Sequence, residues 1–445
     1  MTPVTTAQSP QLLRAAVFHT PRNPFRDDTA LESYSDGGLL IRDRRIEACG
    51  DFQPLRRTYP DAIEIDLRGG FLLPGLIDTH VHFPQLRALG CLGRSLLDWL
   101  EECALPEERK MGDMQYASQA ARTFLRALVS HGTTSALVFG AHFLPATEAL
   151  LEAADSSGLR IITGLVLSDR KLTADLHQTP EAAYRDSTSL IRQFHRRGRL
   201  QYAVTPRFAL STSEAMLEVC QTIMREHQGL RLQTHMNENL LEIEQVKNAF
   251  PWAKDYLAVY ERFGLACPSA VMAHNVHPTD GELERLASSR TAIVHCPSSN
   301  AALGSGLFPL RRHLQAGVQC ALGTDVGGGT GFGMLKEGLQ AYLMQRIAPN
   351  GCILSAAHLL YLVTRAGAEA LGLESETGDF SAGKAADILY LRPPEDSPLA
   401  EVLRASDSPE RTLGALFTMA SSESVDEVRV EGAVVYRPEQ SAEPR

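Results

Sequence analysis

The feature that most constrains the fold of this chain is an alternation of short apolar segments with amphipathic helical patterns between residues 71 and 373. One helical pattern runs from Met114 to Leu128 at i, i+3, i+4 spacing, with Asp113 in the N-cap position and Gly132 just past its end. Eight segments look like strands: 71–85, 135–139, 160–167, 200–206, 230–235, 270–274, 291–296 and 318–323. Because strands interleaved with helices form parallel sheets, the pattern predicts an α/β fold, a closed (β/α)8 TIM-like barrel over residues 71–373.

The two flanks of this region have a different pattern. Between residues 12 and 67, four short apolar runs alternate with turns, which is typical of an all-β unit. After residue 373 the pattern returns to β, with a strand at 388–391 and a strand pair at 428–435 that turns at Glu431-Gly432. We therefore expect a small β-sandwich domain built from both chain termini, residues 11–70 plus 374–440. Residues 1–10 are polar and are expected to be a disordered tail.

Charge and composition exclude several classes of function. The formal net charge of −10 argues against nucleic acid as a partner, because surfaces that bind phosphate backbones are usually basic. The chain shows neither a secretory signal nor a run of about 18 apolar residues, so we expect a cytoplasmic protein without membrane contact. Its eight cysteines include no Cys-x-x-Cys pair, and we expect buried or free thiols instead of disulfides.

A His-x-His pair follows the first barrel strand. Side chains alternate along a strand, so His80 and His82 lie on the same face, about 6.5 Å apart along the backbone. Two imidazoles at this spacing can bind one metal ion, since zinc accepts nitrogen ligands at roughly 2.0–2.1 Å. The alternative is that both histidines merely line a solvated strand end, and this pair alone does not decide between the two.

Further ionisable side chains follow three other predicted strands. His235 ends the fifth strand and Glu238 follows it, His274 ends the sixth, and Asp325 follows the eighth. In barrel enzymes this end of the sheet forms the mouth of the active site. A chance set of core and rim histidines would not be expected to fall on four strand ends together. The pattern therefore favours a metal-dependent active site over purely structural histidines.

The motifs at these strand ends identify a family resemblance. The chain resembles the amidohydrolase superfamily and, within it, the guanine deaminase family over nearly its full length. The motifs that carry the resemblance are Pro74–His82 with Pro84-Gln85, Pro206-Arg207-Phe208, His235–Asn239, His295–Asn300, Leu303–Phe308 and Gly323–Gly329. The His-x-His pair and the aspartate after strand eight are common to the superfamily. The narrower motifs with Gln85 and with Arg207 carry the guanine assignment.

The resemblance implies a metal site and its ligands. His80, His82, His235 and Asp325 would bind one Zn²⁺ per chain. Superfamily members with two metals often bridge them with a lysine from strand four, and residues 204–208 contain none, which favours a mononuclear site. Fe²⁺ or another divalent ion remains an alternative, because mixed His/Asp sites discriminate poorly between metals by ligand type.

The resemblance also implies a reaction, the hydrolytic deamination of guanine to xanthine and ammonia in purine catabolism or salvage. Zinc would lower the pKa of a bound water toward about 7, and this water would attack the amino-bearing C2 of guanine. Glu238 would carry the proton to the ring nitrogen and then to the departing amine. Asp325 would accept the water's proton, and His274 would hold or polarise the water. The alternative role for His274 is structural support of the site.

Three further residues would read the purine. Gln85 offers a donor and an acceptor together, Arg207 donates hydrogen bonds to a carbonyl oxygen or ring nitrogen, and Phe208 would stack on the ring or form a wall of the pocket. Glu238 and His274 are expected to contact the substrate as well. Members of this family are commonly dimers, so a homodimer is expected.

Three alternatives stay open at this stage. The same machinery could serve another purine or pyrimidine, or an s-triazine, and Gln85, Arg207 and Phe208 are the residues that would differ. Deaminases of polynucleotides use a different signature, His-x-Glu with Pro-Cys-x-x-Cys, which is absent. A non-catalytic relative would be expected to lose metal ligands, and this chain has all of them. The roles of His295 and of Ser298–Asn300 are left undecided.

Overall fold

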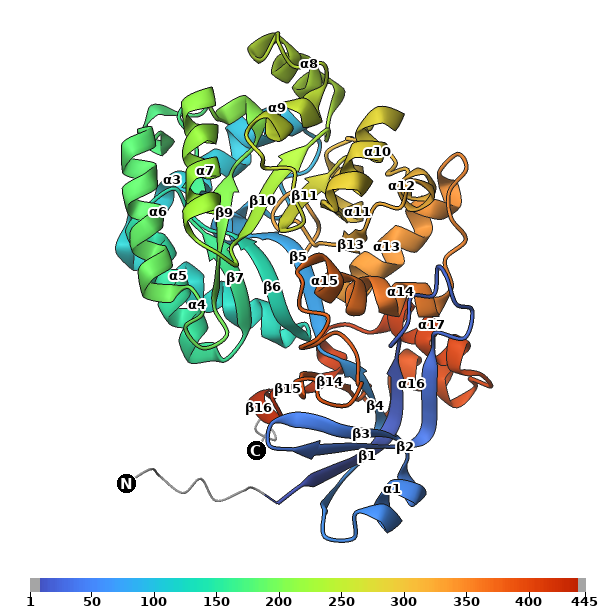
Figure 1. The fold of residues 1–445 in the computed structure, drawn as a ribbon. Helices are drawn as coiled ribbons and strands as arrows, with labels where there is room; N and C mark the ends of the chain where they lie inside the picture. The colour runs from blue at the N-terminus through green and yellow to red at the C-terminus, as the bar shows by residue number, and fades with distance from the viewer. Residues whose placement is uncertain (1–8, 439–445) are drawn as a thin grey trace, which may run out of the picture.

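The computed structural model describes residues 9–438, and its larger part is a barrel of parallel strands surrounded by helices (Figure 1). Eight strands follow one another around the barrel in chain order, and the two-residue β8 (Val166–Leu167) pairs beside β9. They are β5 (Leu76–His82), β6 (Thr133–Phe139), β7 (Arg160–Gly164), β9 (Gln201–Pro206), β10 (Arg231–Met236), β11 (Ala270–His274), β12 (Ala292–His295) and β13 (Cys320–Leu322). The predicted barrel is confirmed.

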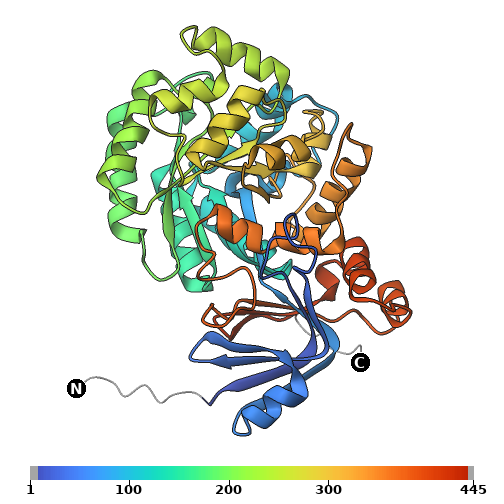
Figure 2. The same ribbon diagram turned by 45° about the vertical axis from the view of Figure 1, so that its right-hand side comes forward.

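Most helices connect the barrel strands and cover the outside of that sheet, whereas the first helix of the chain packs against terminal strands and the last two follow the barrel (Figures 1 and 2). Those up to β10 are α1 (Phe52–Thr58), α2 (Leu96–Trp99), α3 (Leu105–Lys110), α4 (Met114–Ser130), α5 (Leu144–Ser157), α6 (Pro180–Phe194) and α7 (Glu214–Glu226). Those after β10 are α8 (Leu240–Ala249), α9 (Tyr256–Arg262), α10 (Asp280–Ser289), α11 (Pro297–Ala302), α12 (Leu310–Ala316), α13 (Met334–Ile347), α14 (Ala356–Val363), α15 (Arg365–Ala370), α16 (Pro398–Arg404) and α17 (Pro409–Met419). None of the helices within residues 9–438 combines the length and hydrophobicity that a bilayer span requires.

Local sequence explains where these elements begin and end. The Asp113 side chain accepts hydrogen bonds from the backbone N–H groups of Gln115 and Tyr116, which caps α4 as predicted. Gly132 follows that helix in the left-handed conformation, where glycine has no Cβ penalty. All seven residues of β5 are buried, as expected of a parallel strand covered on both faces.

The first and last barrel strands meet at a seam made partly by side chains. The Thr324 N–H and hydroxyl donate to the Asp78 carboxylate at 3.1 and 2.5 Å, and the Asp325 N–H donates to the carbonyl of His80 at 2.8 Å. Burial raises the pKa of Asp78 to about 7, despite the hydrogen bonds that it accepts from Thr324. The barrel thus closes beside the predicted metal ligands.

A second sheet lies below the barrel and contains strands from both ends of the chain, drawn in blue and red in Figures 1 and 2. Its order is β16-β15-β14-β4-β1-β2-β3, so β4 lies between the parallel β1 and the antiparallel β14. The strands are β1 (Gln11–His19), β2 (Glu32–Arg42), β3 (Arg45–Asp51), β4 (Ile63–Pro74), β14 (Ile388–Leu391), β15 (Val425–Val430) and β16 (Ala433–Tyr436). The separate β unit from both termini is confirmed, and it takes the form of one seven-stranded mixed sheet.

Two features of this region go beyond the sequence prediction. Helices α16 and α17 interrupt the C-terminal β segment, and α17 packs against α13 and α14 of the barrel. The domain limits drawn from the sequence at residues 70 and 373 stay predictions. The tail predicted over residues 1–10 lies, apart from its last two residues, outside the described residues.

Candidate active site

Four of the predicted ligand side chains converge at the mouth of the barrel. His80 and His82 come from β5, His235 from β10, and Asp325 from the loop after β13. The Nε2 atom of His82 lies 3.3 Å from that of His80 and 3.1 Å from that of His235. The Asp325 Oδ1 lies 3.2 Å from the His80 Nε2 and 3.3 Å from the His82 Nε2. One donor atom from each of the four residues therefore falls within 4.8 Å of all the others.

The protonation of this cluster suits a divalent cation. Burial lowers the pKa of His80, of His82 (to about 4) and of His235, so the three imidazoles are neutral at pH 7 and have a lone pair to donate. Burial alone would raise the pKa of Asp325, but hydrogen bonds from His80 and His82 hold it well below its usual range. Three neutral nitrogens facing one another around a carboxylate form a donor set that fits a divalent metal ion.

Groups around the four candidate ligands fix their orientation. The His235 Nδ1 lies 2.6 Å from the carbonyl oxygen of Arg207, and a proton donated there leaves Nε2 free to bind a metal. The Phe139 ring packs at 4.5 Å from the His82 ring and at 5.0 Å from the His80 ring, and it forms an apolar floor. A rigid, apolar surround of this kind holds the donors in place and limits access of water.

Glu238 and His274 lie on the other side of Asp325. The His274 Nε2 is 3.4 Å from the Glu238 Oε2 and 3.8 Å from the Asp325 Oδ2, while its Nδ1 lies 2.9 Å from the Asn300 Oδ1. Ser305 donates a hydrogen bond to the Glu238 Oε1 at 3.2 Å. Burial, together with the negative charge of Asp325, raises the pKa of Glu238 to about 8. A carboxyl group with this pKa can both donate and accept a proton near neutral pH.

The structure shows the contacts of His295 and Asn300, whose roles the sequence left undecided. The His295 ring stacks on Phe308 at 4.5 Å, and its Nδ1 lies 3.5 Å from the Asn300 Nδ2. Asn300 in turn contacts His274, so it connects the two histidines. Cys296 is buried, and this raises the pKa of its thiol well above the usual value, which disfavours a nucleophilic role.

Gln85, Arg207 and Phe208 are all buried and line the same pocket as three of the four candidate ligands, His82, His235 and Asp325. The Arg207 guanidinium lies 5.6 Å from the centre of the Phe208 ring. The structure adds a residue that the sequence analysis missed, Glu108 of α3. Its Oε1 accepts hydrogen bonds from the Gln85 Nε2 at 2.7 Å and from the Arg207 Nη2 at 3.0 Å.

Three apolar residues of the segment after β5 also line the pocket, Leu96, Trp99 and Leu100. The free volume of the pocket is only about 20 Å³, enough for about one water, so a purine needs some of the lining side chains to move. A disulfide between Cys91 and Cys103 brackets these three residues, so the prediction of free thiols is wrong for this pair.

The loop after β13 depends on glycine. A Cβ at Gly327 would lie 2.4 Å from the carbonyl oxygen of Gln85, and one at Gly329 would lie 1.9 Å from the carbonyl oxygen of Thr324. These clashes explain why a glycine run follows Asp325. The Gly327 N–H also donates to the Gln85 Oε1 at 3.2 Å, so the loop reaches the substrate side of the pocket.

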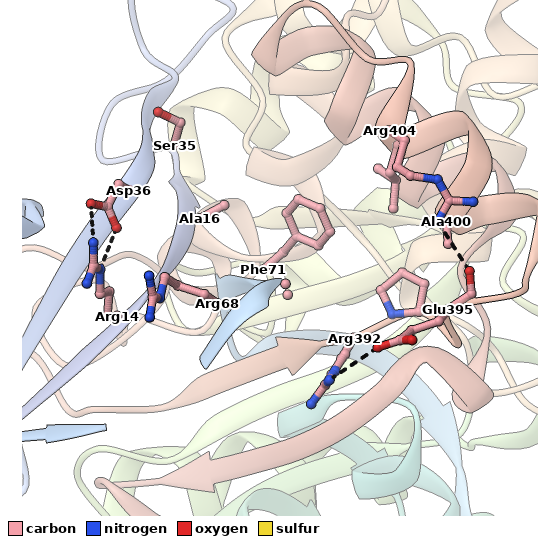
Figure 3. A pocket seen from close by; sticks show the side chains of 14 residues that line it. Arg14, Ala16, Ser35, Asp36, Arg68, Phe71, Arg392, Glu395, Ala400 and Arg404 are labelled. Atoms are coloured by element: carbon pink, nitrogen blue, oxygen red, sulfur yellow. Dashed lines mark hydrogen bonds and ion pairs between the residues drawn. The ribbon is translucent and has the colours of Figure 1, made fainter. Parts of the chain in front are cut away.

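A larger hollow of about 610 Å³ lies beside the terminal sheet and is lined by arginines (Figure 3). Each arginine that lines it has an acidic partner. The pairs are Arg14 with Asp36, Arg68 with Asp66, Arg392 with Glu395, and Arg404 with Glu401. The charge of the arginines in this hollow is thus largely compensated. The candidate metal ligands converge at the barrel mouth, which is therefore the better candidate for the active site.

Comparison with known proteins identifies the family of this chain. The model of the amidohydrolase family matches residues 71–435. The chain belongs to the amidohydrolase family. This amidohydrolase is 52% identical over 438 residues to a probable guanine deaminase of Deinococcus radiodurans, a match that covers 97% of this chain and all of the relative. The resemblance inferred from the motifs is therefore confirmed.

Solved structures agree with the sequence comparison. The Escherichia coli guanine deaminase superimposes on this amidohydrolase with a TM-score of 0.92 at 35% identity, covering 97% of this chain and all of that one. A guanine deaminase from C. acetobutylicum, solved with guanine in its active site, gives a TM-score of 0.89 at 25% identity over 96% of this chain and all of that one. The whole architecture, including the terminal sheet, is shared with these enzymes.

Proposed function

We propose that this amidohydrolase converts guanine to xanthine and ammonia by hydrolysis. The observation that carries the proposal is the pocket itself, in which the candidate metal ligands, an acid–base pair of Glu238 and His274, and the Gln85–Arg207 pair enclose one small volume. The similarity to guanine deaminases, one of them solved with bound guanine, supports the same substrate.

The metal would be held by His80, His82, His235 and Asp325, as one Zn²⁺ or a similar divalent ion per chain. When bound, such an ion lowers the pKa of a coordinated water toward about 7 and so supplies a nucleophile. A single ion is favoured because β9, the strand from which superfamily members with two metals often take a bridging lysine, offers no lysine over residues 204–208.

The chain's own residues would manage the protons. His274 would orient the attacking water toward C2 of guanine, and Asp325 would accept the proton that the water loses. Glu238, with its pKa raised to about 8, would donate a proton to the adjacent ring nitrogen. The deprotonated Glu238 would then take the remaining proton of the C2 hydroxyl and deliver it to the departing amine, so that the C2–N bond breaks, ammonia leaves and the C2 carbonyl of xanthine forms. The proton held by Asp325 would return to Glu238, which restores both carboxyl groups and leaves neutral xanthine and ammonia.

Gln85, Arg207 and Phe208 would select and orient the base. The Gln85 amide can match a purine edge with both a donor and an acceptor, and the Arg207 guanidinium can donate to carbonyl or ring acceptors. Phe208 would wall the ring. These contacts would hold C2, and not another ring position, near the metal ligands.

Two further properties are part of the proposal. We infer a cytoplasmic location by resemblance to guanine deaminases. We also infer a homodimer, by resemblance to the family.

A substrate screen tests the proposed function. Purified protein with measured metal content is assayed for ammonia release from guanine, adenine, cytosine and an aminated s-triazine. Guanine should be the preferred substrate, with xanthine formed in a one-to-one ratio to ammonia. Metal-loaded protein that is inactive on guanine, or that prefers a triazine, would overturn the assignment.

A further inference from the structure

Glu108 occupies an unusual place for an acidic residue. It lies on α3, in a run of charged residues that would suit an exposed helix surface, yet only 3% of it is exposed. A buried carboxylate is costly unless other groups compensate its charge. The groups that compensate Glu108 are the two side chains proposed to read the substrate, Gln85 and Arg207.

One oxygen of Glu108 holds both of these side chains. Its Oε1 accepts from the Gln85 Nε2, while the Gln85 Oε1 accepts from the Gly327 N–H at 3.2 Å. Both ends of the Gln85 amide are therefore fixed, and a flip would break both hydrogen bonds. Arg207 donates from Nη2 to the same oxygen, and within residues 9–438 its other guanidinium nitrogens have no hydrogen-bond partner. Those nitrogens are left to meet a ligand in the pocket.

The second oxygen of Glu108 faces His142. The Glu108 Oε2 is buried without a hydrogen bond, 3.3 Å from the His142 Nδ1, and the His142 Nε2 lies 3.3 Å from the Ser168 Oγ. Burial lowers the pKa of His142 to about 4, so its ring is neutral at pH 7. Burial would also raise the pKa of Glu108, but the charge of Arg207, the charge that His142 acquires in acid, and the hydrogen bonds from Arg207 and Gln85 lower it to about 2. Glu108 is therefore an anion throughout the physiological range.

We propose that Glu108 is a positioning residue for substrate specificity, which fixes Gln85 and Arg207 and cancels the charge of Arg207 so that the pocket selects a neutral purine over a purine anion. This inference rests on the proposed function. Arg207 then supplies directional N–H donors without a net positive field. A pocket with an uncompensated arginine would instead favour anionic ring systems.

The purely structural alternative is that Glu108 only anchors α3 to the barrel. The two roles differ in what a neutral replacement does. An anchor affects stability and all ligands alike. A residue that sets the charge of the pocket affects the two kinds of ligand in opposite directions. Its neutral replacement weakens the binding of a neutral purine and strengthens the binding of a purine anion.

The test uses Glu108→Gln, which keeps the shape and removes the charge, and Glu108→Asp, which keeps the charge. Glu107→Gln is the matched control, because Glu107 is the preceding residue and bonds with Lys110 and Tyr116 outside the pocket. For each protein, metal content, melting temperature, KM and kcat for guanine, and the inhibition constant of urate, a purine anion at neutral pH, are measured.

We expect Glu108→Gln to keep its metal, to raise KM for guanine about 10- to 100-fold through lost charge-assisted hydrogen bonds, and to change kcat much less. Urate should bind about tenfold more tightly than it does to the wild type, because the Arg207 charge is no longer cancelled. Glu108→Asp should have a KM for guanine between those of the wild type and Glu108→Gln, and its affinity for urate should be closer to the weak affinity of the wild type. Glu107→Gln should match the wild type in all of these.

Unchanged KM together with unchanged urate inhibition in Glu108→Gln would overturn the inference, as would equal losses for both ligands. If Glu108→Gln does not fold, the double variant Glu108→Gln/Arg207→Gln is compared with Arg207→Gln alone, since the two buried charges are then removed together. The double variant should lose little more guanine affinity than Arg207→Gln, because Glu108 acts through Arg207, and a further large loss would overturn the inference. If the wild type itself does not deaminate guanine, the proposed function fails. The changes in KM and in urate inhibition between wild type and variants are then measured with the aminated ring that the wild type does accept.

Discussion

Glu238 shows how environment sets the chemistry of a single residue. Its carboxyl group is buried beside Asp325, and its pKa is raised to about 8, whereas Asp325 keeps its charge because two histidines donate to it. Two carboxyl groups in one pocket are thus driven to opposite protonation states, an arrangement suited to acid–base catalysis.

This contrast leads to a prediction for Glu238→Gln. The amide preserves shape but cannot transfer a proton, so kcat should fall by roughly 10²- to 10⁴-fold while metal content and melting temperature stay near wild type. Glu244→Gln, on the exposed face of α8, is the control. A variant with near-native turnover would show that Glu238 is not the proton shuttle.

Arg207 gives a second prediction at this scale. Guanine should be preferred to adenine by roughly 10⁴-fold or more in kcat/KM, because adenine lacks the O6 acceptor and would leave buried donors unpaired. Arg207→Ala should raise KM for guanine and narrow that gap, as measured by steady-state kinetics on both bases. A wild type that deaminates both bases at comparable rates would contradict the proposed reading of the base.

The sequence revealed some of these residues and not others, for physical reasons. His80, His82, His235, His274 and Asp325 could be found because each falls at a strand end. Glu108 gave no signal, since Pro106-Glu107-Glu108-Arg109 looks like a solvated helix turn. Its burial depends on tertiary contacts with Gln85 and Arg207, which a local pattern does not encode.

At the scale of elements, the barrel strands were predictable because buried parallel strands are short, apolar and punctuated by turns. The hairpin of β15 and β16 was equally clear, with Glu431 and Gly432 in the left-handed conformation at its turn. Helix α17 was missed because its burial depends on α13 and α14, distant in sequence, and α16 packs in turn against α17. Helix α2, whose Leu96 and Trp99 line the pocket, was missed as well, since it has only four residues.

Asp379 connects two elements that belong to different parts of the fold. Its buried carboxylate accepts hydrogen bonds from Lys384, in the turn before β14, and from Arg365, the first residue of α15. Burial alone would raise its pKa, but hydrogen bonds from Lys384 and Ser381, with the charge of Lys384, lower it below the usual range. The pairs therefore connect the terminal sheet to the barrel electrostatically.

We predict that Asp379→Asn lowers the free energy of unfolding by about 3 kcal/mol at pH 7, because it leaves the buried cation of Lys384 without its carboxylate partner. A depressed folded-state pKa stabilises the protein above the unfolded value near 4 and loses that effect as pH falls through the folded value. Denaturant melts at several pH values should thus show the gap between wild type and variant closing below pH 4. A gap independent of pH would refute the ionic explanation.

At the scale of the whole molecule, the candidate metal ligands come from strands far apart in the chain. Metal bound to these four ligands would stabilise only the folded barrel. The stabilisation would grow with the logarithm of the ratio of the free metal concentration to its Kd. Chelation should therefore lower the melting temperature by a few degrees, and stoichiometric zinc should restore it. His80→Ala and Asp325→Ala should lose both the metal and this response, and two tightly held ions per chain would contradict the mononuclear proposal.

The seam between β5 and the end of β13 has a consequence for how the chain is made. Thr324 bonds to Asp78, 246 positions earlier in the chain. At a synthesis rate of about 5–20 residues per second, the first barrel strand leaves the ribosome roughly 10–50 s before its closing partner. During that time the three histidines can be present without the aspartate. The nascent protein therefore cannot complete its ligand set, and metal loading becomes a late, essentially post-translational event.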